Sequence, residues 1–147
     1  MVNLDCLEWL EYAQKDISAA QVLFSAPQNP RHRPIEIILY HCQQGAEKAL
    51  KAYLIQQGTL IKDMQTHKMQ VLRLKCTVYN ATFNNQRLLK HCAFLDPFSV
   101  AVRYPKHNIA LDSTVALRGI NSAKRIYDFV SERLGLGKVY FKTPTGS

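Results

Sequence analysis

The sequence has no apolar run that approaches the roughly 20 residues needed to cross a bilayer. Its four cysteines are widely spaced without a C-x-x-C pair, which is atypical of a structural zinc site or a disulfide scaffold. Its six glycines are scattered, so neither a P-loop nor a dinucleotide fingerprint is present. Near the N-terminus, Asp5, Glu8 and Glu11 stand where a signal peptide carries Lys or Arg. We expect a soluble cytoplasmic protein with reduced core thiols, no metal and no cofactor.

What is present is a chain of ordinary globular composition with a strong positive charge. Its 147 residues are 47% hydrophobic and 20% charged, which fits one folded domain. The 19 Lys and Arg against 11 Asp and Glu give a net charge of +8, and most of the excess lies in the second half. Such a surface favours nucleic acid, nucleotides or acidic proteins, although a solvated basic surface would explain the charge equally well.

Apolar residues recur with helical periodicity, and no useful strand-like alternation occurs before the C-terminal tail. Asp5 and Glu8 resemble a capping box at the start of a first helix, which the prolines of residues 26–34 should end near residue 25. A second helix is predicted from about residue 34 to residue 57, with Glu47 and Lys51 paired on its solvent side.

Two shorter helices are predicted next. Thr66 is expected to cap the first, with Tyr79 on its inner face, and Asn84 or Asn85 to cap the second.

A long last helix is predicted to open at Asp112 or Ser113 and to stop at Gly135. Three long and two short helices predict an all-α fold, an up-and-down four-helix bundle with a shorter fifth helix. We expect residues 1–135 to form this helical domain and residues 136–147 to be a mobile tail.

The long connection before the last helix carries the residues with the clearest chemical potential. Arg103 is a fixed cation, and His107 can exchange a proton near neutral pH. Such a pair could stabilise a phosphorane-like transition state and move its proton, as metal-independent RNA cleavage requires. The alternative is structural: Arg103 bonds loop carbonyls, Tyr104 plugs the end of the bundle, and His107 is exposed.

A second candidate is a polar cluster on the predicted second helix. Gln44, Glu47, Lys48 and Lys51 are neighbours at spacings of three and four residues. They could bind a ligand or a partner helix, or could form a solvated helix face.

Several segments resemble the HEPN domain family. The segment 40–53, Tyr-His-Cys-Gln-Gln-Gly-Ala-Glu-Lys-Ala-Leu-Lys-Ala-Tyr, is similar to the second-helix signature of that family. The other similar segments are an early helix with Trp9, Thr-His-Lys-Met at 66–69, Arg-Tyr-Pro at 103–105, and Ile-Tyr-Asp-Phe-Val at 126–130. The resemblance covers about residues 5–134 and implies a helical bundle that forms a symmetric homodimer with a cleft between its subunits.

The resemblance also implies a choice between two activities. Many HEPN proteins are metal-independent ribonucleases of toxin-antitoxin systems, in which four to six residues separate an Arg from a His. Here only three residues separate Arg103 from His107, and one of them is Pro105. The Arg-Tyr-Pro form is more similar to the branch that lacks the ribonuclease motif, binds nucleotides and is often associated with minimal nucleotidyltransferases.

We therefore predict a non-catalytic protein that binds a nucleotide or RNA and acts with a nucleotidyltransferase partner. The enzyme alternative is a ribonuclease toxin that uses Arg103 and His107 as catalytic residues across the dimer. A third, structural alternative is a domain that only positions or neutralises the nucleotidyltransferase. The predicted ligand-binding residues are Arg103, Tyr104, Lys106, Gln44, Glu47 and Lys48.

Overall fold

The structure is a computed structural model that describes residues 1–99 and 111–138. These residues contain five α-helices and no strand, so the predicted all-α fold is confirmed. The helices are α1 (Leu4–Ser25), α2 (Ile35–Gln56), α3 (Met69–Thr77), α4 (Gln86–Leu95) and α5 (Ser113–Arg133). Among the described residues, no helix combines the length and apolarity that a membrane span requires.

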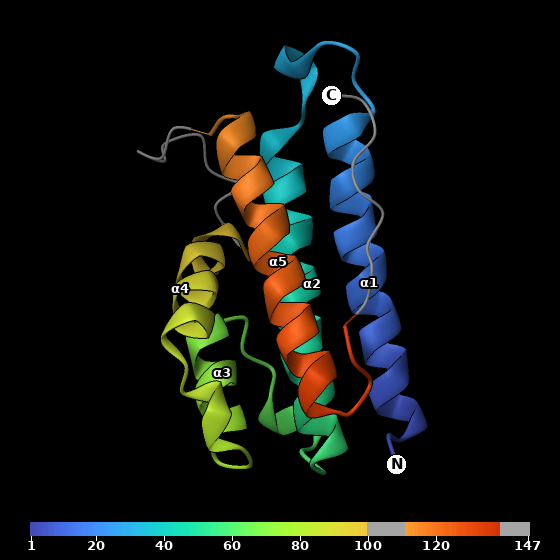
Figure 1. Cartoon of the computed structure of the whole chain (residues 1–147), viewed down its shortest axis with the longest axis vertical. Coiled ribbons are helices and arrows are strands. Elements are labelled where there is room, and N and C mark those ends of the chain that lie inside the picture. The colour runs from blue at the N-terminus through green and yellow to red at the C-terminus, as the bar shows by residue number, and fades with distance from the viewer. Residues whose placement is uncertain (100–110, 139–147) are drawn as a thin grey trace.

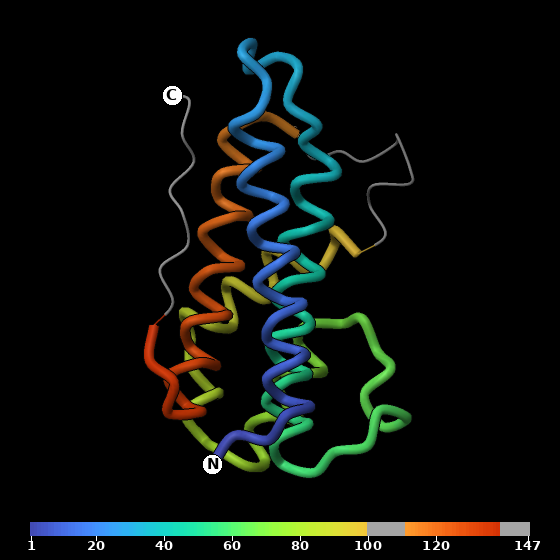
Figure 2. Tube along the Cα trace, turned by 90° about the vertical axis from the view of Figure 1, so that its right-hand side faces the viewer, coloured from blue at the N-terminus to red at the C-terminus, as the bar shows by residue number. Residues whose placement is uncertain are grey.

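The three long helices stand side by side and the two short ones cover one flank (Figure 1). α2 and α5 run in the same direction, and α1 runs antiparallel to both. α2 contacts each of the other four helices, and α4 packs on α5. The segment between α2 and α3 loops out from the bundle (Figure 2). The bundle therefore has α2 at its centre and the α4–α5 pair on its surface.

Two glycines allow the long helices to approach closely. A Cβ atom on Gly45 of α2 would lie 2.7 Å from Cγ1 of Ile17 and 3.1 Å from the backbone oxygen of Ala13, both on α1. A Cβ atom on Gly119 of α5 would lie 2.5 Å from Cδ2 of Leu39 on α2. Both distances to carbon are shorter than van der Waals contact, so these helix contacts depend on the missing side chain.

The predicted helix ends are confirmed where the capping residue is adjacent to the helix in the sequence. The Asn85 side chain accepts from the backbone N–H groups of Arg87 and Leu88, and Asp112 caps α5, as predicted. Gly135 has a φ of +76° just after α5 and thus provides the predicted stop. At the start of α1, however, the cap is Asn3. The prediction of a capping box at Asp5 and Glu8 was wrong, because Asn3, two residues before Asp5, accepts from the N–H of Cys6.

The start of α3 differs from the prediction. Thr66 Oγ1 accepts only from the N–H of Lys68, before the helix begins. The first N–H of α3, on Met69, donates instead to Asp96 Oδ1 at 2.6 Å. Tyr79, predicted to face inward, is 50% exposed, because α3 already ends at Thr77.

The four cysteines are free and buried, as the sequence predicts. Burial raises the pKa of the Cys6 thiol to about 11 and that of Cys92 to about 12. It also raises the pKa of Cys42 and Cys76. The thiols therefore stay protonated near neutral pH and act as small apolar core residues.

Candidate functional site

Glu47 of α2 is at the centre of a buried polar network. Its carboxylate is 3.1 Å from Nζ of Lys51, 3.0 Å from Nδ1 of His67, and accepts from the Gln43 side chain at 3.1 Å. Glu47 is 3% exposed and Lys51 is 7% exposed. The Glu47–Lys51 pair is thus present but not on the solvent side as predicted, because the segment after α2 returns with His67 to cover it.

Lys48 belongs to a separate ion-pair cluster between α1 and α2. The Asp16 carboxylate on α1 accepts from Lys48 Nζ at 2.5 Å and lies 2.9 Å from Nδ1 of His41. Gln44 donates to the side chain of Gln43 at 2.8 Å. The predicted residues Gln44, Glu47 and Lys48 therefore share a helix, but each has a polar partner within the chain.

The other predicted site residues lie in the segment 100–110, outside the residues that the structure describes. They are the predicted ligand-binding residues Arg103, Tyr104 and Lys106, and His107 of the ribonuclease alternative.

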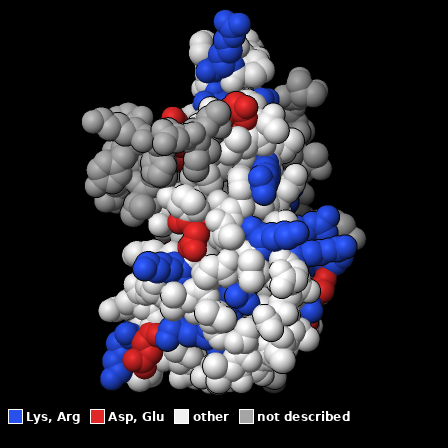
Figure 3. All heavy atoms as spheres, turned by 90° about the vertical axis from the view of Figure 1, so that its left-hand side faces the viewer, with Lys and Arg blue, Asp and Glu red and all other residues white. Residues whose placement is uncertain are grey.

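Two adjacent hollows lie between α4 and α5, and they share Arg87 and His91. We call them together the α4–α5 groove. The first hollow has a volume of about 510 Å³, and the second has a volume of about 500 Å³. Figure 3 shows the flank formed by the short helices, where Lys and Arg side chains gather at mid-height along the right-hand edge.

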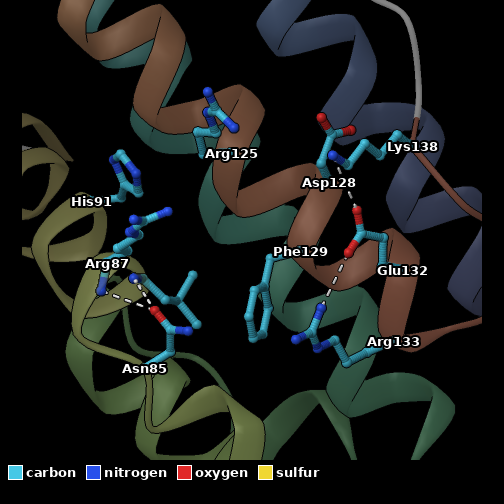
Figure 4. Close-up of a pocket in the computed structure, with 10 residues that line it drawn as sticks. Asn85, Arg87, His91, Arg125, Asp128, Phe129, Glu132, Arg133 and Lys138 are labelled. Atoms are coloured by element: carbon cyan, nitrogen blue, oxygen red, sulfur yellow. Dashed lines mark hydrogen bonds and ion pairs between the residues drawn. The ribbon is translucent and has the colours of Figure 1, made fainter.

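The groove is strongly basic, particularly in its second hollow. That hollow is lined by Arg87 and Lys90 of α4 and by Arg118 of α5, and its described lining contains no Asp or Glu. The first hollow adds Arg125, and its carboxylates are Asp128 and Glu132. The lining also contains Arg133 and Lys138, which both pair with Glu132 and are at the end of the hollow away from His91 (Figure 4).

The geometry of two helices places these cations together. Arg87 and His91 are four residues apart on α4, and Arg118 and Arg125 are seven apart on α5, so each pair lies on one helix face. In Figure 4 the side chains of Arg87, His91 and Arg125 lie next to one another across the gap between the helices. The groove therefore concentrates positive charge supplied by two separate segments.

Three of these cations form no ion pair within residues 1–99 and 111–138. In this part of the chain, the structure shows no side-chain hydrogen bond or ion pair for Arg87, Lys90 or Arg125. Arg118 stacks on Phe94, with its guanidinium carbon 4.1 Å from the ring centroid. A guanidinium can bind a phosphate through two parallel hydrogen bonds without losing its proton. The groove can thus bind a phosphate-bearing anion.

His91 is half-buried at the junction of the two hollows. Its Nδ1 lies 2.9 Å from Oγ of Ser122 on α5. Burial, Arg125 and Arg118 lower the pKa of His91 below its ordinary value, so the ring is neutral at neutral pH. The uncharged imidazole adds no further positive charge to the cations around it.

The sequence contained two signals of this groove. One is the positive excess in the second half of the chain, and the other is the helical spacing of Arg87 with His91 and of Arg118 with Arg125. Periodicity alone did not show that the two helix faces meet.

Within the described residues, no group of three or more His, Cys, Asp or Glu side chains is arranged to hold a metal ion.

Comparison with known proteins gives one match. A family model described as HEPN domain matches residues 6–134, which is most of the chain. No curated protein and no solved structure matches. The family match supports a function connected with nucleotides or RNA. The family match, together with the five-helix bundle, shows that the chain belongs to the HEPN domain family.

Proposed function

We propose that this protein binds a nucleotide or RNA through its phosphates in the α4–α5 groove and does not cleave it. The observation that carries the proposal is the group formed by Arg87, Lys90, Arg118 and Arg125, in which Arg87, Lys90 and Arg125 form no ion pair with a described residue. Unpaired cations on a folded surface repel one another, and an anion that binds between them relieves this repulsion.

Rigid helices make the groove suited to recognition. The buried residues Leu88 and Cys92 anchor α4, and Ser122 and Ile126 anchor α5, while the arginines next to them stay exposed. The positions of the arginine backbones are therefore fixed before the ligand arrives, which reduces the entropy lost on binding.

The residues predicted from the sequence enter the proposal as additional contacts. Thr114, in the first turn of α5, lines the second hollow, so the groove extends to the helix end that follows residues 100–110 in the chain. We propose Arg103 and Lys106 as further phosphate contacts and Tyr104 as a stacking residue. The α2 side chains of Gln44, Glu47 and Lys48 then shape the site or the dimer seam.

We also propose the assembly that the family resemblance implies. The protein forms a homodimer and acts with a minimal nucleotidyltransferase partner in a toxin-antitoxin pair. The basic charge of α4 and α5 contrasts with the acidic start of α1, where Asp5 and Glu8 line a hollow with Trp9. Two surfaces of opposite charge allow one chain to contact a nucleic acid and a protein at the same time.

The proposal is tested by thermal unfolding and by incubation with RNA. A ligand that binds only the folded protein raises its melting temperature, so ATP or a single-stranded RNA should shift the transition upward. The same RNA should stay intact during incubation with the protein in the presence of a metal chelator. No shift with either ligand would contradict the proposal. Cleavage that is lost in His107→Ala would replace it with the ribonuclease alternative.

A further inference from the structure

His91 differs from the other described histidines that have a side-chain partner. His41 and His67 each lie within 3.0 Å of a carboxylate oxygen, on Asp16 and Glu47 respectively. The partner of His91 within residues 1–99 and 111–138 is the neutral hydroxyl of Ser122. His91 therefore lacks the negative charge that would stabilise its protonated form.

Charged groups from both helices surround His91. α4 contributes Arg87 and Lys90, and α5 contributes Arg118 and Arg125. Asp128, Glu132, Arg133 and Lys138 line the remainder of the first hollow, and the last two pair with Glu132. Burial disfavours the imidazolium most, and Arg125 and Arg118 disfavour it as well. The electrostatic potential at His91 is thus positive, which favours the binding of an anion.

A bound phosphate would offset this positive potential at His91. A phosphate held between Arg87 of α4 and Arg125 of α5 would lie near the His91 ring, because the three residues line one hollow (Figure 4). Its negative charge favours the protonated ring, which can then donate to a phosphate oxygen while Nδ1–H donates to Ser122 Oγ. In the loaded site both ring N–H groups would then donate to a protein or ligand oxygen.

We propose that Arg87, His91 and Arg125 form a proton-coupled phosphate subsite, in which His91 takes up one proton from solvent when a phosphate binds. This inference rests on the proposed function, since it requires that the groove binds a phosphate-bearing ligand. No covalent bond changes: the imidazole gains a proton, and the phosphate stays intact. Affinity then increases as the pH falls.

A probe of constant charge separates this effect from titration of the ligand. Terminal phosphates titrate near pH 6, whereas phosphodiesters do not, so we choose oligo(U) of about ten nucleotides without terminal phosphates. Isothermal titration calorimetry in two non-phosphate buffers of different ionisation enthalpy measures the protons taken up per RNA bound.

The wild-type protein should bind this RNA with net proton uptake, and its affinity should increase between about pH 8 and about pH 6 by at most about tenfold per pH unit. In His91→Gln, the part of the uptake that belongs to His91 should disappear and affinity should vary little with pH. His32→Gln is the matched control, because His32 is exposed between α1 and α2 and lines neither hollow of the groove. It should keep the wild-type uptake.

A second variant, with a permanent charge, keeps the inference testable if His91→Gln does not fold. His91→Arg should bind more tightly than the wild type at about pH 8, because its positive charge is permanent, and should show no uptake at this position. If His91→Gln keeps the wild-type proton uptake, the subsite inference is wrong while the proposed function stands. If the wild type binds neither oligo(U) nor ATP at either pH, the proposed function itself fails.

Discussion

Asp96 accepts a hydrogen bond from the backbone N–H of Met69 at 2.6 Å, across 27 residues of chain. The first turn of α3 is therefore capped by a residue that follows α4. This contact joins the ends of the two short helices and helps to fix α4, which carries one side of the candidate groove.

Removal of this cap should destabilise the fold. Asp96→Ala leaves the Met69 N–H without its acceptor, and loss of a helix cap costs about 1 kcal/mol of unfolding free energy. Urea denaturation monitored by circular dichroism measures the change. Thr66→Ala, at the cap position predicted from the sequence, should have the smaller effect. The reverse order would show that Thr66 is the cap in solution.

The buried Glu47–Lys51 pair should be far more sensitive to mutation than its exposed equivalent. Glu47→Ala leaves the buried Lys51 ammonium without its carboxylate, which costs about 3 to 5 kcal/mol. Glu11→Ala breaks a pair of the same spacing, Glu11–Lys15, whose side chains are 64% exposed, and should change stability little. Equal effects in urea denaturation would contradict the burial described for Glu47.

The close contact between α1 and α2 at Gly45 should not tolerate a methyl group. Gly45→Ala should lower stability by about 1 to 3 kcal/mol from overpacking against Ala13 and Ile17, partly offset by the better helix propensity of alanine. Asn121→Ala, on an exposed position of α5, serves as the control and should be tolerated. A melting temperature for Gly45→Ala at or above that of the wild type would show that the helices pack further apart.

The cysteines should make stability decline at alkaline pH. Burial raises the pKa of Cys6 to about 11 and that of Cys92 to about 12, whereas a thiol in the unfolded chain has a pKa of about 8.5. Between these values the unfolded chain has lost protons that the folded chain keeps. The stability contributed by the thiols is therefore complete below about pH 8.5 and falls as the pH rises.

Thiol labelling tests the same property directly. At about pH 8, a disulfide reagent should react slowly with the native protein and rapidly with all four thiols in denaturant, because the thiolate is the reactive form. Rapid labelling of the native protein would contradict the burial of the cysteines.

Local signals in the sequence predicted the helices well. Asn85, Asp112 and Gly135 act through their own backbone neighbours, so their spacing was sufficient to place the ends of α4 and α5. The cap of α3 was mispredicted because its acceptor, Asp96, is distant in the sequence.

The candidate site was less accessible to the same reasoning. Periodicity placed Glu47 and Lys51 on a polar face, but the return of His67 over that face is a tertiary contact. In the same way, the groove arises only where the faces with Arg87 and Arg125 meet across two helices. The predicted contact Arg103 lies outside the described residues, and its role stays a prediction.

The most direct test of the account is the affinity for single-stranded RNA of two double variants with equal loss of charge. Arg118→Ala with Arg125→Ala removes two groove cations, and Arg31→Ala with Lys62→Ala removes two exposed cations elsewhere. We predict that the groove variant weakens binding by about tenfold or more and reduces the slope of log affinity against log salt by about 1.4, or 0.7 for each lost phosphate contact. The control should stay close to the wild type. Equal weakening in both variants would contradict a localised site, because the protein would then bind RNA through its net charge alone.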